Sequence, residues 1–411
     1  MMWFYNFCIT IYAMLIRLAS PFYAKARLWH KGRRGMFERM QSTIVKGERL
    51  VWVHVASLGD FEQGRPVVDY IRKHYPDYKI LLTFFSPSGY EVRKNYPNAD
   101  YVFYIPADTK RKVRKFLDIV NPEVAIFVKY EFWLNMLTEL HKRKVRTFIV
   151  SAIFRRNSIF FRPFGSIWRK ALHSFEMLFV QDEKSKKLLA GIGVENVVVA
   201  GDTRFDRVSA IADSADSVEV VEQFKGNSRL FVAGSTWGAD EEILLPLINK
   251  NPDIKFIIAP HEIDEARIER LMREVNGGAV RYTQLPQTDF TDKQVLILDI
   301  MGLLSRAYGS ADWAYVGGGF GAGTHNTLEA AVYGLPIAFG TKYRKFKEAC
   351  DLTALGVARS VKSEQELKAW FEELKSDNDY LARLAVVAKV YVGQHRGATE
   401  KIVKTIFQIK N

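Results

Sequence analysis

A glycine-rich run, GGGFGAGTHNTLE at residues 317–329, carries side chains suited to holding an anionic ligand. It follows a short apolar stretch and precedes a helical pattern over Leu328–Tyr333. Glycines let a backbone approach a ligand closely, and a helix start directs N–H groups at phosphate. His325 and Asn326 can donate to phosphate or base, and Glu329 can accept from ribose hydroxyls. An isolated run of this kind is often only a tight turn, but the strand–loop–helix context favours nucleotide binding. The predicted ligand-binding residues of the run are Gly323, Thr324, His325, Asn326, Thr327, Leu328 and Glu329.

Three further polar segments follow apolar runs in the same half of the chain. Ser235 and Thr236 either contact phosphate or cap an acid-rich helix, and the sequence leaves both alternatives open. His261, after Pro260, is placed to contact phosphate or base. Backbone groups at Asp299–Gly302 can hold a pyrimidine base. All three segments are predicted to face the same site as the glycine-rich run, because carboxyl ends of parallel strands share one edge.

The first half offers candidates for acid–base chemistry. In HVASLGDFEQG, Asp60 stands near a helix start, where it is either a general base or an acid favoured by the helix dipole. In KYEFW, Lys129 and Glu131 end an apolar strand, and a charged pair there is seldom core. In GDTRFD, Arg204 is always cationic and suits a carboxylate or phosphate.

Short runs rich in Val, Ile and Phe alternate with amphipathic stretches, which is typical of parallel sheets covered by helices. The predicted strands are Leu50–Val55, Ile80–Phe85, Tyr101–Ile105, Val124–Val128, Thr147–Ser151, Met177–Val180, Val197–Ala200, Leu230–Ala233, Lys255–Ala259, Val280–Tyr282, Val295–Leu298, Trp313–Val316 and Pro336–Phe339. Helices are predicted over Gln63–His74, Lys110–Val120, Glu364–Ser376 and Tyr380–Val392.

The alternation lapses once, between two such series, and this divides the chain. We predict an anchor and basic segment at 1–35, a Rossmann-like domain at 36–206 and a polar linker at 207–228. A second Rossmann-like domain follows at 229–395, and a C-terminal helix at 396–411. Two doubly wound parallel sheets bind ligands beyond the carboxyl ends of their strands, here predicted to be in a cleft between the domains.

The chain is strongly basic, with a formal net charge of +13 over 411 residues. That charge suggests nucleic acid, an anionic membrane or a phosphorylated substrate as partner. No stripe of alternating basic and aromatic residues supports nucleic acid. The two cysteines, Cys8 and Cys350, are far apart, so neither a disulfide framework nor a zinc site is expected, and a reducing compartment fits.

The first 37 residues contain no acid, and Trp3–Ile16 is almost wholly apolar. A basic cluster follows it, which argues against a cleaved signal peptide and for a cytoplasmic remainder of the chain. The run either spans a membrane when tilted and extended to Phe22, or lies in the interface. An ordinary buried helix is the remaining alternative.

Together these segments resemble one family, the 3-deoxy-D-manno-octulosonic acid (Kdo) transferases of lipopolysaccharide assembly. The resemblance rests on five segments in order, from the N-terminal region to about residue 360: HVASLGD, EFW, GDTRFD, APH and GGGFGAGTHNTLE. It implies a GT-B fold with two Rossmann-like domains facing a cleft and an N-terminal membrane anchor. It also implies an inverting, metal-independent transfer from CMP-Kdo to a phosphorylated lipid A precursor, lipid IVA, at the cytoplasmic face of the inner membrane.

The same resemblance assigns residues. It implies CMP contacts at Pro260 and His261, at the segment Met301, Gly302 and Leu303, and at the loop carrying His325, Asn326 and Glu329. It matches Glu131 and Arg204 to positions that stabilise the transition state.

One position departs from the family pattern, because Asp60 stands where the family has a catalytic Glu. Either Asp60 is the base with a shifted loop, which we favour, or Glu62 serves instead, or the enzyme is weakened. Leu303 replaces another common Glu, a change that a backbone contact to the base survives. Rival functions are another GT-B enzyme using a UDP-sugar, an epimerase included, and a membrane-bound homologue with little or no catalysis.

Overall fold

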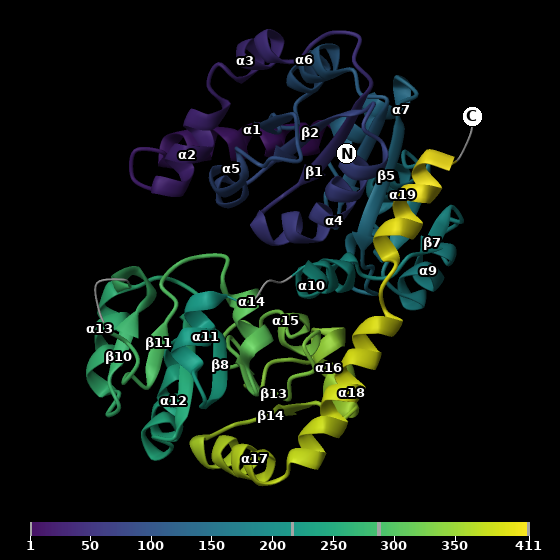
Figure 1. Ribbon diagram of the computed structural model, residues 1–411. Helices are drawn as coiled ribbons and strands as arrows, with labels where there is room; N and C mark the ends of the chain where they lie inside the picture. Colours follow the sequence, from purple (N-terminus) through teal and green to yellow (C-terminus); the bar gives the residue numbers. More distant parts are fainter. Residues whose placement is uncertain (1, 215–217, 286–288, 409–411) are drawn as a thin grey trace. The chain divides into compact units, whose positions relative to one another are not determined.

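The computed structural model describes residues 2–214, 218–285 and 289–408. It divides into two compact units, Met1–Arg207 with Arg396–Asn411, and Val208–His395. Each unit is a seven-stranded parallel sheet covered by helices (Figure 1). Residues 215–217 of the predicted linker and 409–411 of the predicted C-terminal helix lie outside the described residues.

The first unit's sheet has the strand order β3-β2-β1-β4-β5-β6-β7. Its strands are β1 (Leu50–Val55), β2 (Lys79–Phe84), β3 (Tyr101–Tyr104), β4 (Val124–Val128), β5 (Arg146–Ala152), β6 (Met177–Val180) and β7 (Val197–Val199). Its helices are α1 (Met2–Ala19), α2 (Ala24–Arg33), α3 (Met36–Thr43), α4 (Leu58–His74), α5 (Pro87–Arg93), α6 (Lys110–Val120), α7 (Leu134–Lys142), η1 (Ile159–Phe161), α8 (Ser166–Leu172), α9 (Glu183–Ala190) and the start of α10 (Thr203–Ser214). The central strands β1 and β4 are buried throughout, as their continuous apolar sequences require.

The last helix, α19 (Ala398–Gln408), belongs to the first unit rather than to a separate element. Its apolar residues Ile402, Val403 and Ile406 are fully buried in the core formed with α4. Asp206 fixes its start, because that carboxylate accepts hydrogen bonds from the Gly397 and Thr399 amides. The chain therefore returns at its end to complete the first core.

The second unit's sheet has the strand order β10-β11-β9-β8-β12-β13-β14. Its strands are β8 (Arg229–Thr236), β9 (Ile254–Pro260), β10 (Ala279–Arg281), β11 (Val295–Ile297), β12 (Trp313–Val316), β13 (Ile337–Phe339) and β14 (Ala358–Ser360). Its helices are α11 (Glu219–Lys225), α12 (Gly238–Lys250), α13 (Glu265–Glu274), η2 (Tyr282–Gln284), α14 (Leu304–Ala307), η3 (Tyr308–Ser310), α15 (Leu328–Ala331), α16 (Lys347–Ala354), α17 (Glu364–Ser376) and α18 (Asn378–Gln394). Its core packs α12 and α17 against one sheet face, around the buried side chains of Phe231, Trp313 and Phe371.

All thirteen strands predicted from the sequence are present, with ends that differ by at most a few residues. The polar segment predicted as a linker contains α11 and most of α10, so it is largely helical. The helix predicted over Leu328–Tyr333 is shorter than predicted. It ends at Ala331, and hydrogen-bonded turns continue to Gly334, whose φ of 87° closes the helical path.

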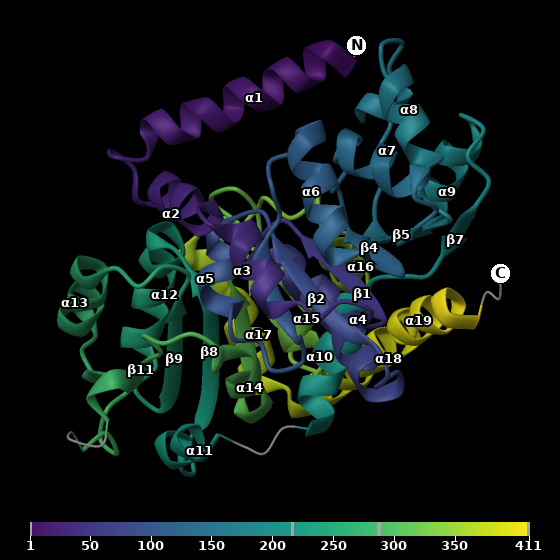
Figure 2. The same ribbon diagram turned by 90° about the horizontal axis from the view of Figure 1, so that it is seen from above.

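Helix α1 lies along the surface of the first unit (Figure 2). Its inward side is polar and aromatic: the Tyr5 hydroxyl donates to Asp108 at 2.6 Å, and Asn6 accepts from Asn135 at 2.7 Å. Its other side is apolar and exposed, including Trp3 and Phe4. By length and hydropathy α1 is the one described helix that is able to cross a membrane, and none of it is buried.

Candidate functional site

Both sheets reverse their winding direction at one pair of strands, and several of the predicted site residues follow those strands. In the first unit the reversal lies between β1 and β4, and in the second between β8 and β12. The segments after β1 and β4 hold Asp60 and Glu131, and the loop after β12 begins at Gly317. Ligands of doubly wound folds bind at such points, because the loops diverge there and leave space.

Asp60 lies in the first turn of α4, three residues after the N-cap Ser57. The Ser57 hydroxyl donates to Asp60 Oδ2 at 2.7 Å, and Lys129 Nζ lies 3.2 Å from Asp60 Oδ1. Each carboxylate oxygen thus has a donor, while 19% of the side chain stays exposed to receive a ligand. The carboxylate is oriented by Ser57 and Lys129, which is how a general base is positioned for proton transfer.

The ammonium partner of Asp60 comes from an unusual backbone position. Lys129 directly follows β4 and has a φ of 64°, in the left-handed region that non-glycine residues seldom occupy. Such a conformation costs roughly 1–2 kcal/mol and persists only where the surroundings enforce it. This backbone conformation places the Lys129 side chain next to Asp60, which follows the neighbouring strand β1.

Glu131 is held by a buried hydrogen-bonded series. Trp133 Nε1 donates to Glu131 Oε2 at 2.7 Å, and His54 Nε2 lies 3.0 Å from the same oxygen. Since a carboxylate only accepts, His54 Nε2 donates to it, and His54 Nδ1 lies 2.9 Å from the Thr83 hydroxyl and 3.2 Å from the Thr83 carbonyl oxygen. His54 is fully buried, so Glu131 is fixed from behind and its second oxygen is left for a ligand.

Arg204 lies in the first turn of α10 and is oriented by Asp202, which accepts from the guanidinium at 2.6 and 2.9 Å. Its neighbour Thr203 is buried, and its hydroxyl donates to the Gln63 carbonyl at 2.6 Å. Gln63 lies one turn beyond Asp60 on α4. The start of α10 and the start of α4 are therefore joined directly.

Glu62, the alternative base, is engaged elsewhere. Arg93 donates to it at 3.0 Å and Arg207 at 3.3 Å, both on a side of α4 away from Lys129. Both oxygens of Glu62 are thus engaged by guanidinium groups. This arrangement favours Asp60 over Glu62.

In the second unit the glycines of the loop serve mainly to pack backbone against backbone. A Cβ on Gly317 would collide with the Ser235 carbonyl, at the end of β8. Gly318 has a φ of 88°, and its amide donates to the buried Asp240 carboxylate at 2.9 Å. The close approach predicted for a ligand is thus made, at Gly317, by the neighbouring strand end.

Asp240 organises this end of the sheet. Besides the Gly318 amide, its carboxylate accepts from the Tyr315 hydroxyl at 2.7 Å and from the Trp237 amide at 2.9 Å. Burial raises the pKa of Asp240, and these hydrogen bonds act in the opposite direction. One carboxylate therefore ties together β12, the glycine-rich loop and the start of α12.

Three rings form a stack at the same edge. His261 stacks on His325 with ring centres 4.1 Å apart, and Trp237 Nε1 donates to His325 Nε2 at 3.1 Å. Burial, and then the neighbouring His261, lowers the pKa of His325 to about 4. Burial likewise lowers the pKa of His261. Both imidazoles are neutral near pH 7, so they offer a hydrogen bond and a stacking face rather than positive charge.

Asn326 and Glu329 also meet: the Asn326 amide donates to Glu329 Oε1 at 3.0 Å, and its oxygen accepts from the Leu328 amide. The following helix, α15, has only four residues. So short a helix has little dipole. That its start faces the phosphate stays a prediction, as does a contribution from the loop amides.

The remaining predicted nucleotide contacts of the glycine-rich loop and of the segment after β9 lie as follows. Thr324, Thr327 and Leu328 are buried under the loop, and Gly323 has a φ of 143°. Pro260 ends β9 and places His261, whose amide donates to the Thr236 carbonyl.

Neither Ser235 nor Thr236 caps α12, whose N-cap is Trp237, so the capping alternative is wrong. The Thr236 hydroxyl donates to Glu241 at 2.9 Å, and Ser235 has a φ of 54°. Ser235 is half-buried, so of this pair it is the one that offers a hydroxyl at the site.

Met301 to Leu303 form the loop after β11. Met301 is 73% exposed, Gly302 has a φ of 98°, and Leu303 is buried. Upstream, burial acts to raise the pKa of Asp299, but hydrogen bonds from Thr283 and Arg281 outweigh it and the pKa is lowered. Asp299 is thus ionised and holds the start of the loop through hydrogen bonds from Thr283 and Arg281. Backbone groups at Met301 and Gly302 are not used in these bonds.

Three residues that complete these sites were not among the predicted site residues. They are His54, Trp237 and Asp240. His54 stood in one of the motifs noted in the sequence, and Asp240 stands three residues after Trp237, the spacing of a capping box. Among the described residues, no group of three or more His, Cys, Asp or Glu side chains is placed to hold a metal.

Residues 31–207 match the family model of 3-deoxy-D-manno-octulosonic-acid transferase (kdotransferase). A 3-deoxy-D-manno-octulosonic acid transferase of Haemophilus influenzae is 25% identical over 86% of this chain and 85% of its own. A bifunctional glycosyltransferase/methyltransferase of Fusobacterium nucleatum is 28% identical over 72% of this chain, which spans only 48% of that protein. A UDP-GlcNAc 2-epimerase from Neisseria meningitidis, solved with UDP-GlcNAc, shares the fold, with a TM-score of 0.63 at 16% identity over 88% of this chain and 100% of its own.

Proposed function

This chain is a relative of the Kdo transferases over most of its length, and on that premise we propose that it moves Kdo from CMP-Kdo to the phosphorylated lipid A precursor, lipid IVA. The observation that carries the proposal is the Asp60 carboxylate, oriented by Ser57 and Lys129 at the strand reversal of the first unit. It lies within the residues that match the family model. The proposed transfer inverts the anomeric centre and needs no metal.

In the proposed reaction an acceptor hydroxyl attacks the anomeric carbon of Kdo while the bond from that carbon to the CMP phosphate breaks. Asp60 takes the hydroxyl proton, and Lys129 keeps that carboxylate in place. Glu131, fixed by His54 and Trp133, is placed to stabilise positive charge that develops on the sugar ring. CMP departs with the bonding electrons.

The leaving phosphate needs compensating positive charge or hydrogen-bond donors. Arg204 provides the charge, and its partner Asp202 fixes the plane of the guanidinium. Loop amides after β12, the Ser235 hydroxyl and the neutral ring of His261 provide donors for the donor nucleotide. Met301 and Gly302 offer backbone groups to the base, and Glu329 a carboxylate to the ribose.

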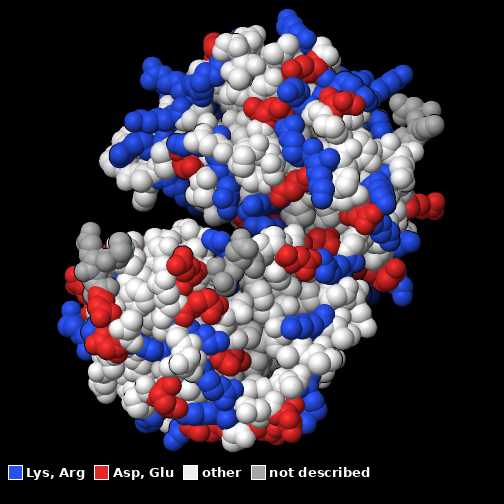
Figure 3. Space-filling model, in the orientation of Figure 1, with Lys and Arg blue, Asp and Glu red and all other residues white. Residues whose placement is uncertain are grey.

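The acceptor is a lipid, so the enzyme must work at a membrane. The exposed apolar side of α1 suits insertion into the interface, Arg17 lies in its last turn, and Lys25 and Arg27 follow soon after it. Because Tyr5 and Asn6 bind α1 to the first unit, we propose that α1 lies in the interface instead of spanning. Lys and Arg gather over this unit on the face in Figure 3, as an anionic cytoplasmic leaflet would favour.

The proposal is tested by incubating purified protein with CMP-Kdo and lipid IVA and following CMP release. We expect Asp60→Asn to lose about 10²–10⁴-fold in kcat, the usual contribution of a general base. Glu62→Gln is the matched control. Glu62 lies about half a helical turn from Asp60 on α4 and is paired with arginines, so we expect this variant to retain most activity. A fully active Asp60→Asn, or an inactive Glu62→Gln with normal folding, would remove Asp60 from the role of base.

The donor is tested separately by competition. We expect CMP to compete for the second unit far better than UDP. Tighter binding of UDP would favour the rival reading as a UDP-sugar enzyme, and vesicle binding without any CMP release would favour a non-catalytic homologue.

A further inference from the structure

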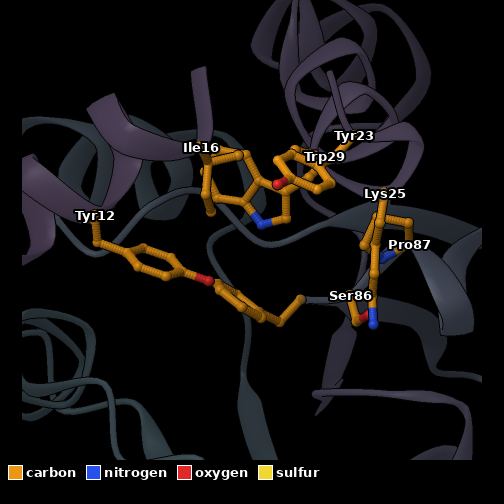
Figure 4. Close-up of a pocket in the computed structure, with 9 residues that line it drawn as sticks. Tyr12, Ile16, Tyr23, Lys25, Trp29, Ser86 and Pro87 are labelled. Atoms are coloured by element: carbon orange, nitrogen blue, oxygen red, sulfur yellow. The ribbon is translucent and has the colours of Figure 1, made fainter. Parts of the chain in front are cut away.

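A cavity of about 410 Å³ lies within the first unit where α1, α2 and the loop after β2 meet (Figure 4). Its volume falls in the range of about 300–1,000 Å³ that small-molecule sites occupy. Its walls are mainly aromatic and aliphatic, and its polar groups are few. The lining residues on which the argument depends are Tyr12, Ile16, Lys25, Ala26, Trp29 and Phe85.

The walls are held in place before any ligand arrives. The Arg33 guanidinium lies 3.9 Å from the Trp29 ring centre and donates to the Phe85 carbonyl at 2.8 Å. Tyr12, from α1, packs against both rings, with centres 6.4 Å from Trp29 and 6.2 Å from Phe85. A preformed cavity saves a ligand the cost of ordering these side chains.

One polar group in the wall lacks a partner. Trp29 is 7% exposed, and its indole Nε1 is buried with no hydrogen-bond partner among the described residues. Figure 4 shows Trp29 among the residues that line the cavity. An unpaired buried donor is costly, so a ligand that brings a carbonyl oxygen to it gains a hydrogen bond.

The cavity is joined to both the membrane-facing helix and the proposed acceptor site. Ile16 and Tyr12 extend it along α1, whose outer side is apolar and exposed. On the other side Phe85 packs on Trp133 with ring centres 5.0 Å apart, and Trp133 donates to Glu131. Only the Trp133 ring therefore separates the cavity wall at Phe85 from the proposed catalytic carboxylate of Glu131.

From these contacts we infer that the cavity binds one acyl chain of the lipid acceptor, with its ester or amide carbonyl on Trp29 Nε1 and Lys25 near the acceptor's phosphate. This inference rests on the proposed function for the identity of the lipid. The apolar walls suit the chain, the single N–H suits its carbonyl, and the rim ammonium suits a phosphorylated head group. The contact through Phe85 and Trp133 favours the acceptor over a bilayer phospholipid, which has no need to reach Glu131.

A photocrosslink tests the site directly and needs no donor sugar. Lipid IVA carrying a diazirine in an acyl chain is irradiated with the full-length protein in phosphatidylglycerol vesicles, and labelled peptides are identified by mass spectrometry. We expect labels in the peptides containing Tyr12 to Trp29 or Phe85, displaced by unlabelled lipid IVA. Labels confined to Trp3, Phe4 and Phe7, or labels that unlabelled lipid IVA does not displace, would overturn the inference.

A pair of matched variants gives a kinetic test. Ala26→Phe fills the cavity, whereas Ala24→Phe adds the same group to the exposed side of α2, outside the lining. We expect the KM for lipid IVA to rise at least about tenfold in Ala26→Phe only, since each buried methylene is worth about fourfold in affinity. With a de-acylated acceptor the two variants should match wild type. An equal effect on both acceptors, or none on either, contradicts the inference.

A third variant guards against misfolding. Trp29→Phe keeps an aromatic wall but removes the N–H together with part of the indole, so we expect a rise in KM of about two- to tenfold, of the order of one hydrogen bond. An unchanged KM overturns the carbonyl contact. If wild-type protein releases no CMP, the proposed transfer fails, while the crosslink still reports on the cavity.

Discussion

The neutral state of His325 at physiological pH is the most quantitative consequence of the second unit's geometry. Its Nε2 accepts a hydrogen bond from Trp237 Nε1, and its ring stacks on His261. Protonation of Nε2 would break the hydrogen bond from Trp237. It would also place a positive charge on the ring that stacks on His261. Burial is the larger cause, and His261 the smaller, of a pKa near 4 instead of the usual 6.5.

The size of the effect follows from that shift. A difference of about 2.5 units at about 1.36 kcal/mol each gives an upper value of about 3.4 kcal/mol. The ring is only partly buried, so solvent screening reduces the expected contribution to about 1–2 kcal/mol. Because the folded pKa lies below the unfolded one, this stability is complete above pH 6.5 and is lost as the pH falls from 6.5 towards 4.

Two measurements check it. Imidazole resonances of ¹³C-histidine-labelled protein are titrated, with His325→Gln for assignment, and urea unfolding is followed by tryptophan fluorescence at pH 7.5 and 5.0. We expect His325 to titrate near 4, and the wild type to lose about 1–2 kcal/mol more than His325→Gln between the two pH values. Titration near 6.5, or equal losses in both proteins, would refute the reasoning.

Three further outcomes are expected. Lys129→Gly and Lys129→Ala should both reduce kcat about 10- to 100-fold by releasing Asp60, while Gly, which tolerates the φ of 64°, leaves the protein about 1 kcal/mol more stable than Ala in urea unfolding. Asp240→Ala should cost about 2–4 kcal/mol of stability by orphaning three buried donors, and should raise the KM for CMP-Kdo more than the KM for the acceptor. Phe4→Ser with Phe7→Ser should weaken co-sedimentation with anionic vesicles at least about tenfold without changing the melting temperature, because these side chains are exposed in the fold.

Periodicity recovered the fold because central strands of parallel sheets are apolar on both faces. β4 and β12 were predicted with their observed ends for this reason. The three-residue edge strand Ala358–Ser360 was missed, since it is too short and too polar to stand out. α15 was predicted too long because the apolar run before Gly334 is as compatible with a helix as with the turns that the structure has there.

The site was predictable only where one strand end sufficed. Asp60 and Glu131 were singled out because each lies in the segment that follows a central strand. Their partners were not assigned, since the sheet alone brings His54 to Glu131 across 77 positions and Trp237 to His325 across 88. The state of His325 likewise depends on burial that no local pattern encodes.

The departure at Asp60 acquires a physical account from these partners. An aspartate is one methylene shorter than glutamate, so its carboxylate stays within the first turn of α4 and reaches the Ser57 hydroxyl at 2.7 Å. The strained backbone at Lys129 brings an ammonium to the other oxygen at 3.2 Å. A longer side chain would carry the carboxylate past the Ser57 hydroxyl. The Lys129 ammonium would then no longer meet the carboxylate at its present position. Asp60, Ser57 and Lys129 are therefore best treated as one unit, in which the shorter acid and the strained lysine each account for the other.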